Sequence, residues 1–290
     1  MYTLCVAVRS AVVRHCRTWS VRLAVAALLL AAKSSASVRP AVANGIDLQQ
    51  LNDKYRNAVV MVEFTTVSNR TATRLNPTKS ENYYGRNDKG GHGSGFFISE
   101  SEIVTNAHVV DDARRGSITV RSPATGSVRF TVEVVGLGDS RVLDLAVLRL
   151  PPDEQLRFRA RAGLDRIPHL ELGESDGLRQ SEPLAILGFP KASDELKVIQ
   201  AEVTGRQYQR YGAQDFMVPH QFVEVGPGGV VQPGNSGGPA LDREGRVVGI
   251  PTLGDYQGNQ GWLIPINLVK RFLPRLREND QGRKARFPGA

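Results

Sequence analysis

The apolar segments of this chain are short, and turn residues such as glycine and proline separate them. Several are rich in valine and isoleucine, as buried β-strands are. In chain order the candidate strands are residues 58–64, 95–98, 118–120, 130–135, 145–150, 184–187, 198–203, 221–225, 246–250 and 262–266. Many short strands with little helical periodicity predict an all-β protein built from barrels or sandwiches.

A polar and basic stretch, residues 151–168, divides these strands into two series. We interpret it as a linker between an N-terminal β unit of about residues 44–150 and a C-terminal β unit of about residues 169–277. The chain has 290 residues, which is long enough to fill both cores. Residues 44–277 are therefore predicted to form the folded domain.

Short helices are expected at both ends of this domain. Asp47 is placed to cap a helix that follows it, because its side chain can accept a hydrogen bond from the first turn. Asn267 is placed to cap an amphipathic helix over residues 268–277, which Pro274 would break or bend. Residues 278–290 are polar and are expected to form a flexible tail.

The first 43 residues have the pattern of a targeting segment. No acidic residue precedes Asp47, four arginines lie within the first 22 residues, and residues 23–32 are an apolar run too short to span a bilayer. Small residues at 41–43 then resemble a cleavage site. This order is typical of a secretory signal and predicts an exported, periplasmic or secreted protein. An arginine-rich leader also fits mitochondrial import, and a retained membrane anchor is the third interpretation.

The charge of the chain comes largely from this leader. The net charge is +8, but six of the 37 basic residues lie in residues 1–43, so 31 basic and 29 acidic residues remain after cleavage. Such a balance does not indicate a nucleic-acid partner. Both cysteines, Cys5 and Cys16, are also in the leader, which leaves no disulfide and no thiolate metal site. We expect no cofactor, no metal and, after leader removal, no stable membrane span.

Residues 232–239, Gln-Pro-Gly-Asn-Ser-Gly-Gly-Pro, place Ser236 among three glycines. Glycine permits a positive φ and a close approach of the backbone, so this loop can expose a hydroxyl and converge N–H groups on one point. An attacking oxygen and an anion-stabilising pocket need this geometry. The alternative is an ordinary surface turn, so the prediction depends on a base and an acid elsewhere.

His108 and Asp144 are the candidates for the base and the acid. His108 follows the strand-like residues 103–105 at a small-residue turn, which would fix an imidazole while leaving it facing a cleft. Asp144 stands at the head of an apolar strand, where a buried carboxylate needs a partner such as a histidine N–H. Alone, Asp144 is as well explained as a turn residue. The chain order His, Asp, Ser is that of chymotrypsin-type enzymes.

With these residues in view, the chain resembles the HtrA/DegP branch of chymotrypsin-like serine proteases. The resemblance covers about residues 45–276 and implies two six-stranded antiparallel β-barrels with the active site between them. The segments that carry it are residues 93–98, 104–110, 144–148, 172–176, 184–190, 234–239 and 262–265. It also implies a serine endopeptidase that acts on unfolded or misfolded proteins in protein quality control, and trimers built through N-terminal contacts.

The resemblance assigns roles to individual residues. Ser236 would be the nucleophile, His108 the general base and Asp144 the residue that orients it, with an acyl-enzyme intermediate. The backbone N–H groups of Gly234 and Ser236 would form the oxyanion hole, with Asn235 as a third contributor.

The S1 pocket is expected at Val230, Leu253 and Trp262, although these residues also suit a core. No acidic residue stands where trypsin-like enzymes bind Arg or Lys, so small or aliphatic P1 side chains are expected.

Two features depart from the family. HtrA proteins carry PDZ domains after the protease domain, and this chain ends before one, which suggests a PDZ-less or truncated member. Residues 225–229 are also longer and richer in glycine than in the family. They border the oxyanion loop, so this loop is expected to be mobile or to need a partner or substrate to order it.

Three other functions were considered. A peptide-binding or chaperone-like protein with a latent protease site is the main alternative, but His108, Asp144 and Ser236 argue for catalysis. A nucleotide binder using residues 90–95 lacks the helix N-terminus that holds phosphate. An esterase acting through the same serine is the third.

Overall fold

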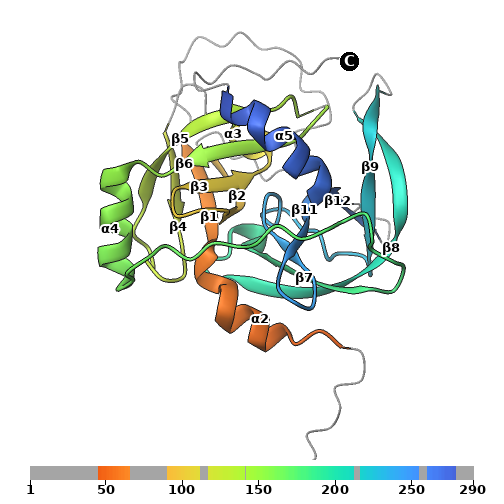
Figure 1. Cartoon of the computed structure of the whole chain (residues 1–290), viewed down its shortest axis with the longest axis horizontal. Helices are drawn as coiled ribbons and strands as arrows, with labels where there is room; N and C mark the ends of the chain where they lie inside the picture. The colour runs from red at the N-terminus through yellow and green to blue at the C-terminus, as the bar shows by residue number, and fades with distance from the viewer. Residues whose placement is uncertain are drawn as a thin grey trace, which may run out of the picture. The chain divides into compact units, whose positions relative to one another are not determined.

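Twelve β-strands in the described part of the chain close into two antiparallel barrels of six strands each (Figure 1). The computed structural model describes residues 45–65, 90–111, 117–140, 142–211, 216–254 and 260–278. The prediction of an all-β fold with two six-stranded barrels is confirmed. The predicted leader, residues 1–43, lies outside the described residues, as does nearly all of the predicted tail.

The N-terminal barrel has the strand order β1-β2-β3-β6-β5-β4. Its strands are β1 (Val59–Thr65), β2 (Gly90–Phe97), β3 (Glu102–Thr105), β4 (Ile118–Arg121), β5 (Phe130–Leu137) and β6 (Ala146–Arg149). The C-terminal barrel has the order β10-β11-β12-β9-β8-β7. Its strands are β7 (Pro183–Gly188), β8 (Lys197–Tyr211), β9 (Phe216–Gly226), β10 (Ala240–Leu241), β11 (Val247–Gly254) and β12 (Gly261–Pro265).

Most predicted strands are present, and their boundaries differ where the sequence is polar or rich in glycine. β2 begins at Gly90, so the glycine-rich residues 90–95 are part of a strand and form no loop before a helix. β8 and β9 extend well beyond the predicted 198–203 and 221–225. The two-residue strand β10 was not predicted.

Both faces of the central strands are buried, and each face contributes to a different core. In β1, Val60 and Val62 belong to a cluster formed by the N-terminal barrel, whereas Val59 and Met61 belong to a second cluster. Successive side chains of a strand point to opposite faces, which explains this alternation. The strands therefore appear in the sequence as continuous apolar runs.

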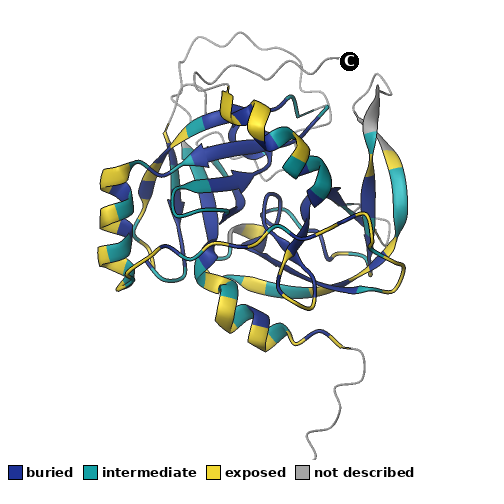
Figure 2. Ribbon diagram, viewed as in Figure 1, coloured by how far each residue is buried: buried dark blue, intermediate teal, exposed yellow. Residues whose placement is uncertain are grey.

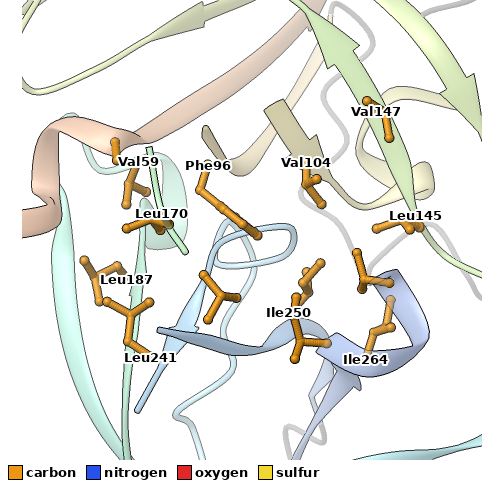
Figure 3. Close-up of a cluster of buried hydrophobic side chains, with 14 of the residues drawn as sticks. Val59, Phe96, Val104, Leu145, Val147, Leu170, Leu187, Leu241, Ile250 and Ile264 are labelled. Atoms are coloured by element: carbon orange, nitrogen blue, oxygen red, sulfur yellow. The ribbon is translucent and has the colours of Figure 1, made fainter. Parts of the chain in front are cut away.

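The second cluster contains residues from both barrels. Figure 3 shows labelled side chains of the N-terminal barrel, such as Phe96 and Leu145, around the same space as Leu187 and Ile264 of the C-terminal barrel. Most strands are largely buried in Figure 2, whereas β8 alternates between buried, intermediate and exposed residues, and the helices and loops carry many of the other exposed residues. This shared core joins the barrels, so side chains at its edge are held in fixed relative positions.

The segment predicted as a linker, residues 151–168, contains the helix α4 (Pro152–Ala162), which was not expected from the sequence. Phe158 is fully buried, and its ring packs edge-on against Phe97 at 5.5 Å between centroids and against Phe130 at 5.1 Å. Leu156, in contrast, is 61% exposed. A helix held mainly by one buried aromatic ring shows no apolar stripe in the sequence.

The N-terminal helix α2 (Leu48–Tyr55) begins as predicted. The Asp47 carboxylate accepts a hydrogen bond from the Gln50 backbone N–H at 2.9 Å. At its end, Tyr55 packs on Gly245 and donates to the carbonyl of Glu244 at 3.3 Å. This contact fixes α2 against the C-terminal barrel.

The C-terminal helix α5 (Ile266–Glu278) differs from its prediction in two ways. It continues through Pro274, and Asn267 lies inside the helix instead of capping it. The Asn267 N–H donates to the hydroxyl of Ser175 at 3.1 Å, and its side chain donates to Glu174. A residue distant in the sequence thus supplies the cap. No helix within the described ranges is long and apolar enough to cross a membrane.

Helix α5 packs directly on β5 of the N-terminal barrel. A methyl group built on Gly136 would lie 2.2 Å from the carbonyl oxygen of Leu276, which is too close for any side chain. We therefore expect Gly136→Ala to destabilise the fold by about 1–3 kcal/mol, because the helix must shift. Chemical denaturation measures this loss.

Gly177→Ala is the matched control, because a methyl group there meets nothing within 4 Å. It should leave the free energy of unfolding unchanged within about 0.5 kcal/mol. Equal stability of the two variants would contradict the close packing of α5 on β5.

Candidate active site

The structure brings His108 and Asp144 together at the ends of two paired strands. His108 lies in the one-turn helix α3 (Ala107–Val110), directly after β3, and Asp144 lies just before β6. β3 and β6 pair with Thr105 opposite Ala146, so their ends are adjacent. His108 Nδ1 lies 2.6 Å from Asp144 Oδ2, and the His108 backbone N–H donates to Oδ1 at 2.9 Å.

The carboxylate of Asp144 is buried and well supplied with donors. The residue is 9% exposed, and the hydroxyl of Thr252 donates to Oδ2 at 2.5 Å. The side chain of Asn106 donates to the Asp144 carbonyl at 2.7 Å. An ionised carboxylate only accepts hydrogen bonds, so the Nδ1 of His108 is the donor and Nε2 is the basic nitrogen.

Thr252 connects this pair with Ser236. It lies in β11 of the C-terminal barrel, and its carbonyl oxygen is 3.5 Å from the hydroxyl oxygen of Ser236. One residue therefore contacts both the acid and the serine. The three predicted residues come together at the junction of the barrels. Thr252 was not predicted from the sequence, because nothing in its local sequence distinguishes it from other strand residues.

The glycines of residues 232–239 are required by their conformation and packing. Gly234 and Gly237 have φ values of 97° and 85°, in the left-handed region that favours glycine. A methyl group on Gly234 would lie 2.2 Å from the carbonyl oxygen of Phe189, and one on Gly237 would lie 2.2 Å from that of Ser94. This agrees with the close backbone approach expected from the sequence.

The N–H groups of this loop differ in their partners. Asn235 N–H donates to the carbonyl of Gln232 at 2.9 Å, and Gly237 N–H donates to that of Pro251 at 3.0 Å. Within the described residues, the N–H groups of Gly234 and Ser236 have no acceptor. The expectation that Asn235 also contributes its N–H is not met, since a turn uses this group. Its fully buried side chain instead donates to Val230.

Ser94 in β2 supports the loop from the N-terminal barrel. Its hydroxyl donates to the Gly234 carbonyl at 2.6 Å and accepts from the Phe189 N–H at 3.0 Å. Its backbone N–H donates to the Ser236 carbonyl at 2.8 Å. Ser94 is completely buried, so these bonds are shielded from water. The sequence analysis noted the segment but assigned it no role in the site.

His92, two residues earlier in β2, lies beside Gly234. Its Nε2 is 3.0 Å from the position that a Cβ on Gly234 would occupy. Burial lowers the pKa of His92; the opposing effect of Glu63, which raises it, is smaller, and Arg121 lowers it further. Burial therefore favours the neutral form of this imidazole beside the loop.

The three residues predicted for the S1 pocket lie in different surroundings. Val230 is 4% exposed and packs in the core of the C-terminal barrel. Leu253 and Trp262 face each other across β11 and β12 and are partly buried. Val231, which follows Val230, packs against Gly254 of β11 and Gly261 of β12. The described residues contain no group of three His, Cys, Asp or Glu side chains that would suit a metal ion.

The two-barrel fold is that of chymotrypsin-like proteins. The profile of the trypsin-like peptidase domain matches residues 93–250, and the chain belongs to this family. Among its relatives, the putative serine protease HhoA of Synechocystis sp. is 33% identical over 228 residues, which cover 73% of this chain and 52% of HhoA. The mitochondrial serine protease HTRA2 of Bos taurus is 33% identical over 186 residues, which cover 63% and 36%.

A solved structure agrees with this assignment. The HtrA-type protease AlgW, determined with a tripeptide, has a TM-score of 0.57 and 22% sequence identity over 80% of this chain and 64% of AlgW. The comparisons with HhoA and HTRA2 confirm the predicted HtrA/DegP type, and the comparison with AlgW shows the shared fold. The chain spans 33% to 52% of the length of the first curated relatives.

The hydroxyl of Thr252 can be tested by its effect on stability. Thr252→Val keeps the shape of the side chain but removes a donor to the buried Asp144 carboxylate, which should cost about 1–3 kcal/mol. Thr252→Ser retains the donor and should cost less. Denaturation curves of the two variants measure the difference. If valine were tolerated as well as serine, the hydroxyl would not be stabilising Asp144.

Proposed function

We propose that this chain is a serine endopeptidase that cleaves peptide bonds through an acyl-enzyme intermediate. The observation that carries the proposal is the geometry at the barrel junction. A buried carboxylate holds an imidazole at 2.6 Å, and Thr252 links that carboxylate to the hydroxyl of Ser236. The nearby loop presents two backbone N–H groups without acceptors among the described residues.

In the first step, Ser236 Oγ attacks the scissile carbonyl carbon while His108 Nε2 accepts its proton. Asp144 stabilises the imidazolium that forms and holds the ring through its contact with Nδ1. The C–N bond then breaks as His108 returns the proton to the leaving amine. In the second half of the reaction, water attacks the acyl carbon while His108 Nε2 accepts its proton. The ester bond to Ser236 Oγ then breaks, and His108 returns the proton to Oγ as the new carboxyl end leaves.

The tetrahedral intermediates carry a negative charge on the former carbonyl oxygen. We propose that the N–H groups of Gly234 and Ser236 donate to it, and the lack of an acceptor for either group among the described residues supports this. Losing one such donor would raise the transition-state energy by about 3–4 kcal/mol. Ser94 supports this arrangement by holding the Gly234 carbonyl.

We propose unfolded or misfolded proteins as substrates and protein quality control as the role. The resemblance to HtrA-type proteases supports this. Curated relatives include a probable periplasmic serine endoprotease of Chlamydia trachomatis and mitochondrial proteases of Arabidopsis thaliana and Bos taurus. For this chain, export to the periplasm or beyond remains our proposal, with mitochondrial import as the alternative. A homotrimer is proposed by resemblance.

For the S1 pocket, small or aliphatic P1 side chains are proposed. The strands that carry Leu253 and Trp262 also carry Gly254 and Gly261, and the side chain of Val231 packs on Gly261. These groups are apolar, so a charged P1 side chain would lose its hydration without gaining an ionic partner there.

A fluorophosphonate probe tests the nucleophile. We expect covalent labelling of the wild-type chain and none of Ser236→Ala, because phosphonylation needs the activated hydroxyl. His108→Ala should lower the labelling rate by at least about 100-fold. Mass spectrometry of the labelled peptide identifies the site. A wild-type chain that resists the probe would favour the peptide-binding or chaperone-like function with a latent site.

The substrate class requires a separate comparison. Unfolded casein should be digested faster than simple alkyl esters of similar concentration, and mapped cleavage sites should follow small or aliphatic residues. Ser236→Ala is the control for a contaminating protease. Efficient ester turnover without casein cleavage would indicate an esterase instead.

A further inference from the structure

The peptide unit between Pro233 and Gly234 determines the direction of one proposed oxyanion donor. Its carbonyl oxygen belongs to Pro233 and its N–H to Gly234, and in a planar trans peptide these groups point in opposite directions. A group that fixes the position of the Pro233 oxygen therefore also fixes the direction of the Gly234 N–H. The backbone N–H of Lys191 donates to the Pro233 oxygen at 2.7 Å.

Lys191 has a backbone conformation that is unusual for a residue other than glycine. The residues Pro190–Ala192 form a single 3₁₀ turn, and Lys191 has φ 54° and ψ 38°. This left-handed conformation is unfavourable for a residue with a side chain. Such a conformation persists where the surrounding structure holds it. The N–H that orients the Pro233–Gly234 peptide thus belongs to a strained residue. Other contacts are needed to hold this residue in position.

Arg121 supplies a contact that reaches this turn from the other barrel. It ends β4, and its side chain is 9% exposed. Its Nη2 donates to the Asp194 carboxylate at 2.6 Å, and Nη1 donates to the Asp194 carbonyl at 3.4 Å. One guanidinium therefore binds both the side chain and the backbone of the residue three positions after Lys191.

The position of Arg121 is itself well defined. Its Nη2 contacts the sulfur of Met61 at 3.0 Å, and its Nε lies 3.6 Å from Glu63 Oε2. Glu63 is held in turn by two hydrogen bonds of 2.8 Å from Arg129. The Asp194 side chain, by contrast, is 90% exposed. The buried guanidinium is thus the fixed end of the link, and the turn is the part that it holds.

We propose that Arg121 is a positioning residue for the oxyanion hole. By binding Asp194 it holds the turn at Pro190–Ala192, whose Lys191 N–H fixes the peptide that presents the Gly234 N–H. The inference rests on the proposed function, since it assigns Arg121 to the step that this site performs. Arg121 touches neither the triad nor the nucleophile loop in any contact described above, so it acts through the turn.

The test removes the Asp194 carboxylate, which is the exposed partner of Arg121. Asp194→Ala should lower kcat for a peptide substrate by at least about tenfold, while KM stays within about twofold. The reason is that an oxyanion donor acts mainly in the transition state, and complete loss of one lowers kcat by about 100- to 1000-fold. Binding of a peptide boronic acid, whose tetrahedral adduct uses the same donors, should weaken in parallel. Asp194→Glu keeps the charge and should restore most of both.

Glu195→Ala is the matched control. Glu195 is the next residue, is 81% exposed in its side chain and pairs with Lys197 on the same segment, so its loss removes a similar charge without touching the link. Its kcat should equal that of the wild type within about twofold. Arg121→Gln provides the second variant and should reproduce the Asp194→Ala effect on kcat.

Hydrogen exchange of the peptides that cover residues 189–194 and 232–239 gives a readout that needs no activity. Faster exchange in Asp194→Ala than in Glu195→Ala is expected. The proposal would be overturned if Asp194→Ala changed neither hydrogen exchange nor kcat. It would also be overturned if Asp194→Ala and Glu195→Ala lowered kcat equally. If the wild type shows no labelling by the fluorophosphonate, the proposed function fails, and the exchange comparison alone decides whether Arg121 holds the loop.

Discussion

The buried carboxylate of Asp144 is the constraint on which the site depends. A charge that is 9% exposed is costly unless donors surround it, and here they come from the backbone and ring of His108 and from Thr252. His108 belongs to the N-terminal barrel and Thr252 to the C-terminal barrel. Hydrogen bonding of this one carboxylate therefore requires both barrels to be in register, and Thr252 also brings its carbonyl oxygen within 3.5 Å of the Ser236 hydroxyl.

The shared core makes this register possible. Alternate residues of the central strands enter the barrel interior or the cluster between the barrels, so each strand is buried on both sides. For the same reason the strands are visible in the sequence as short valine- and isoleucine-rich runs, and the fold class followed from them. β10 was missed because two residues, Ala240 and Leu241, are too few to show a pattern.

The elements that the sequence did not reveal depend on contacts between distant residues. Helix α4 is held by Phe158 alone among large apolar side chains, although Pro152 at its start and Gly163 at φ 65° after its end are ordinary helix boundary signals. Thr252 and Ser94 act through hydrogen bonds to Asp144 and Gly234, more than 100 residues away in the sequence. His108, Asp144 and Ser236 could be proposed from the sequence because each lies in a distinctive local context.

The two halves of the proposed site are held by interactions of different strength. The acid–base half is fixed by short hydrogen bonds around a buried carboxylate, and breaking them would expose an unpaired charge. The oxyanion half is held on one side by the buried Ser94, and on the other by a turn with a strained Lys191 and an exposed Asp194. Only the Arg121 end of the Arg121–Asp194 contact is buried, and a segment held through an exposed side chain opens locally before a core does. Rotation of the Pro233–Gly234 peptide would abolish stabilisation of the intermediate while leaving Ser236, His108 and Asp144 in place. The less firmly held part of the proposed site is therefore the one that would bind the negative charge of the intermediate.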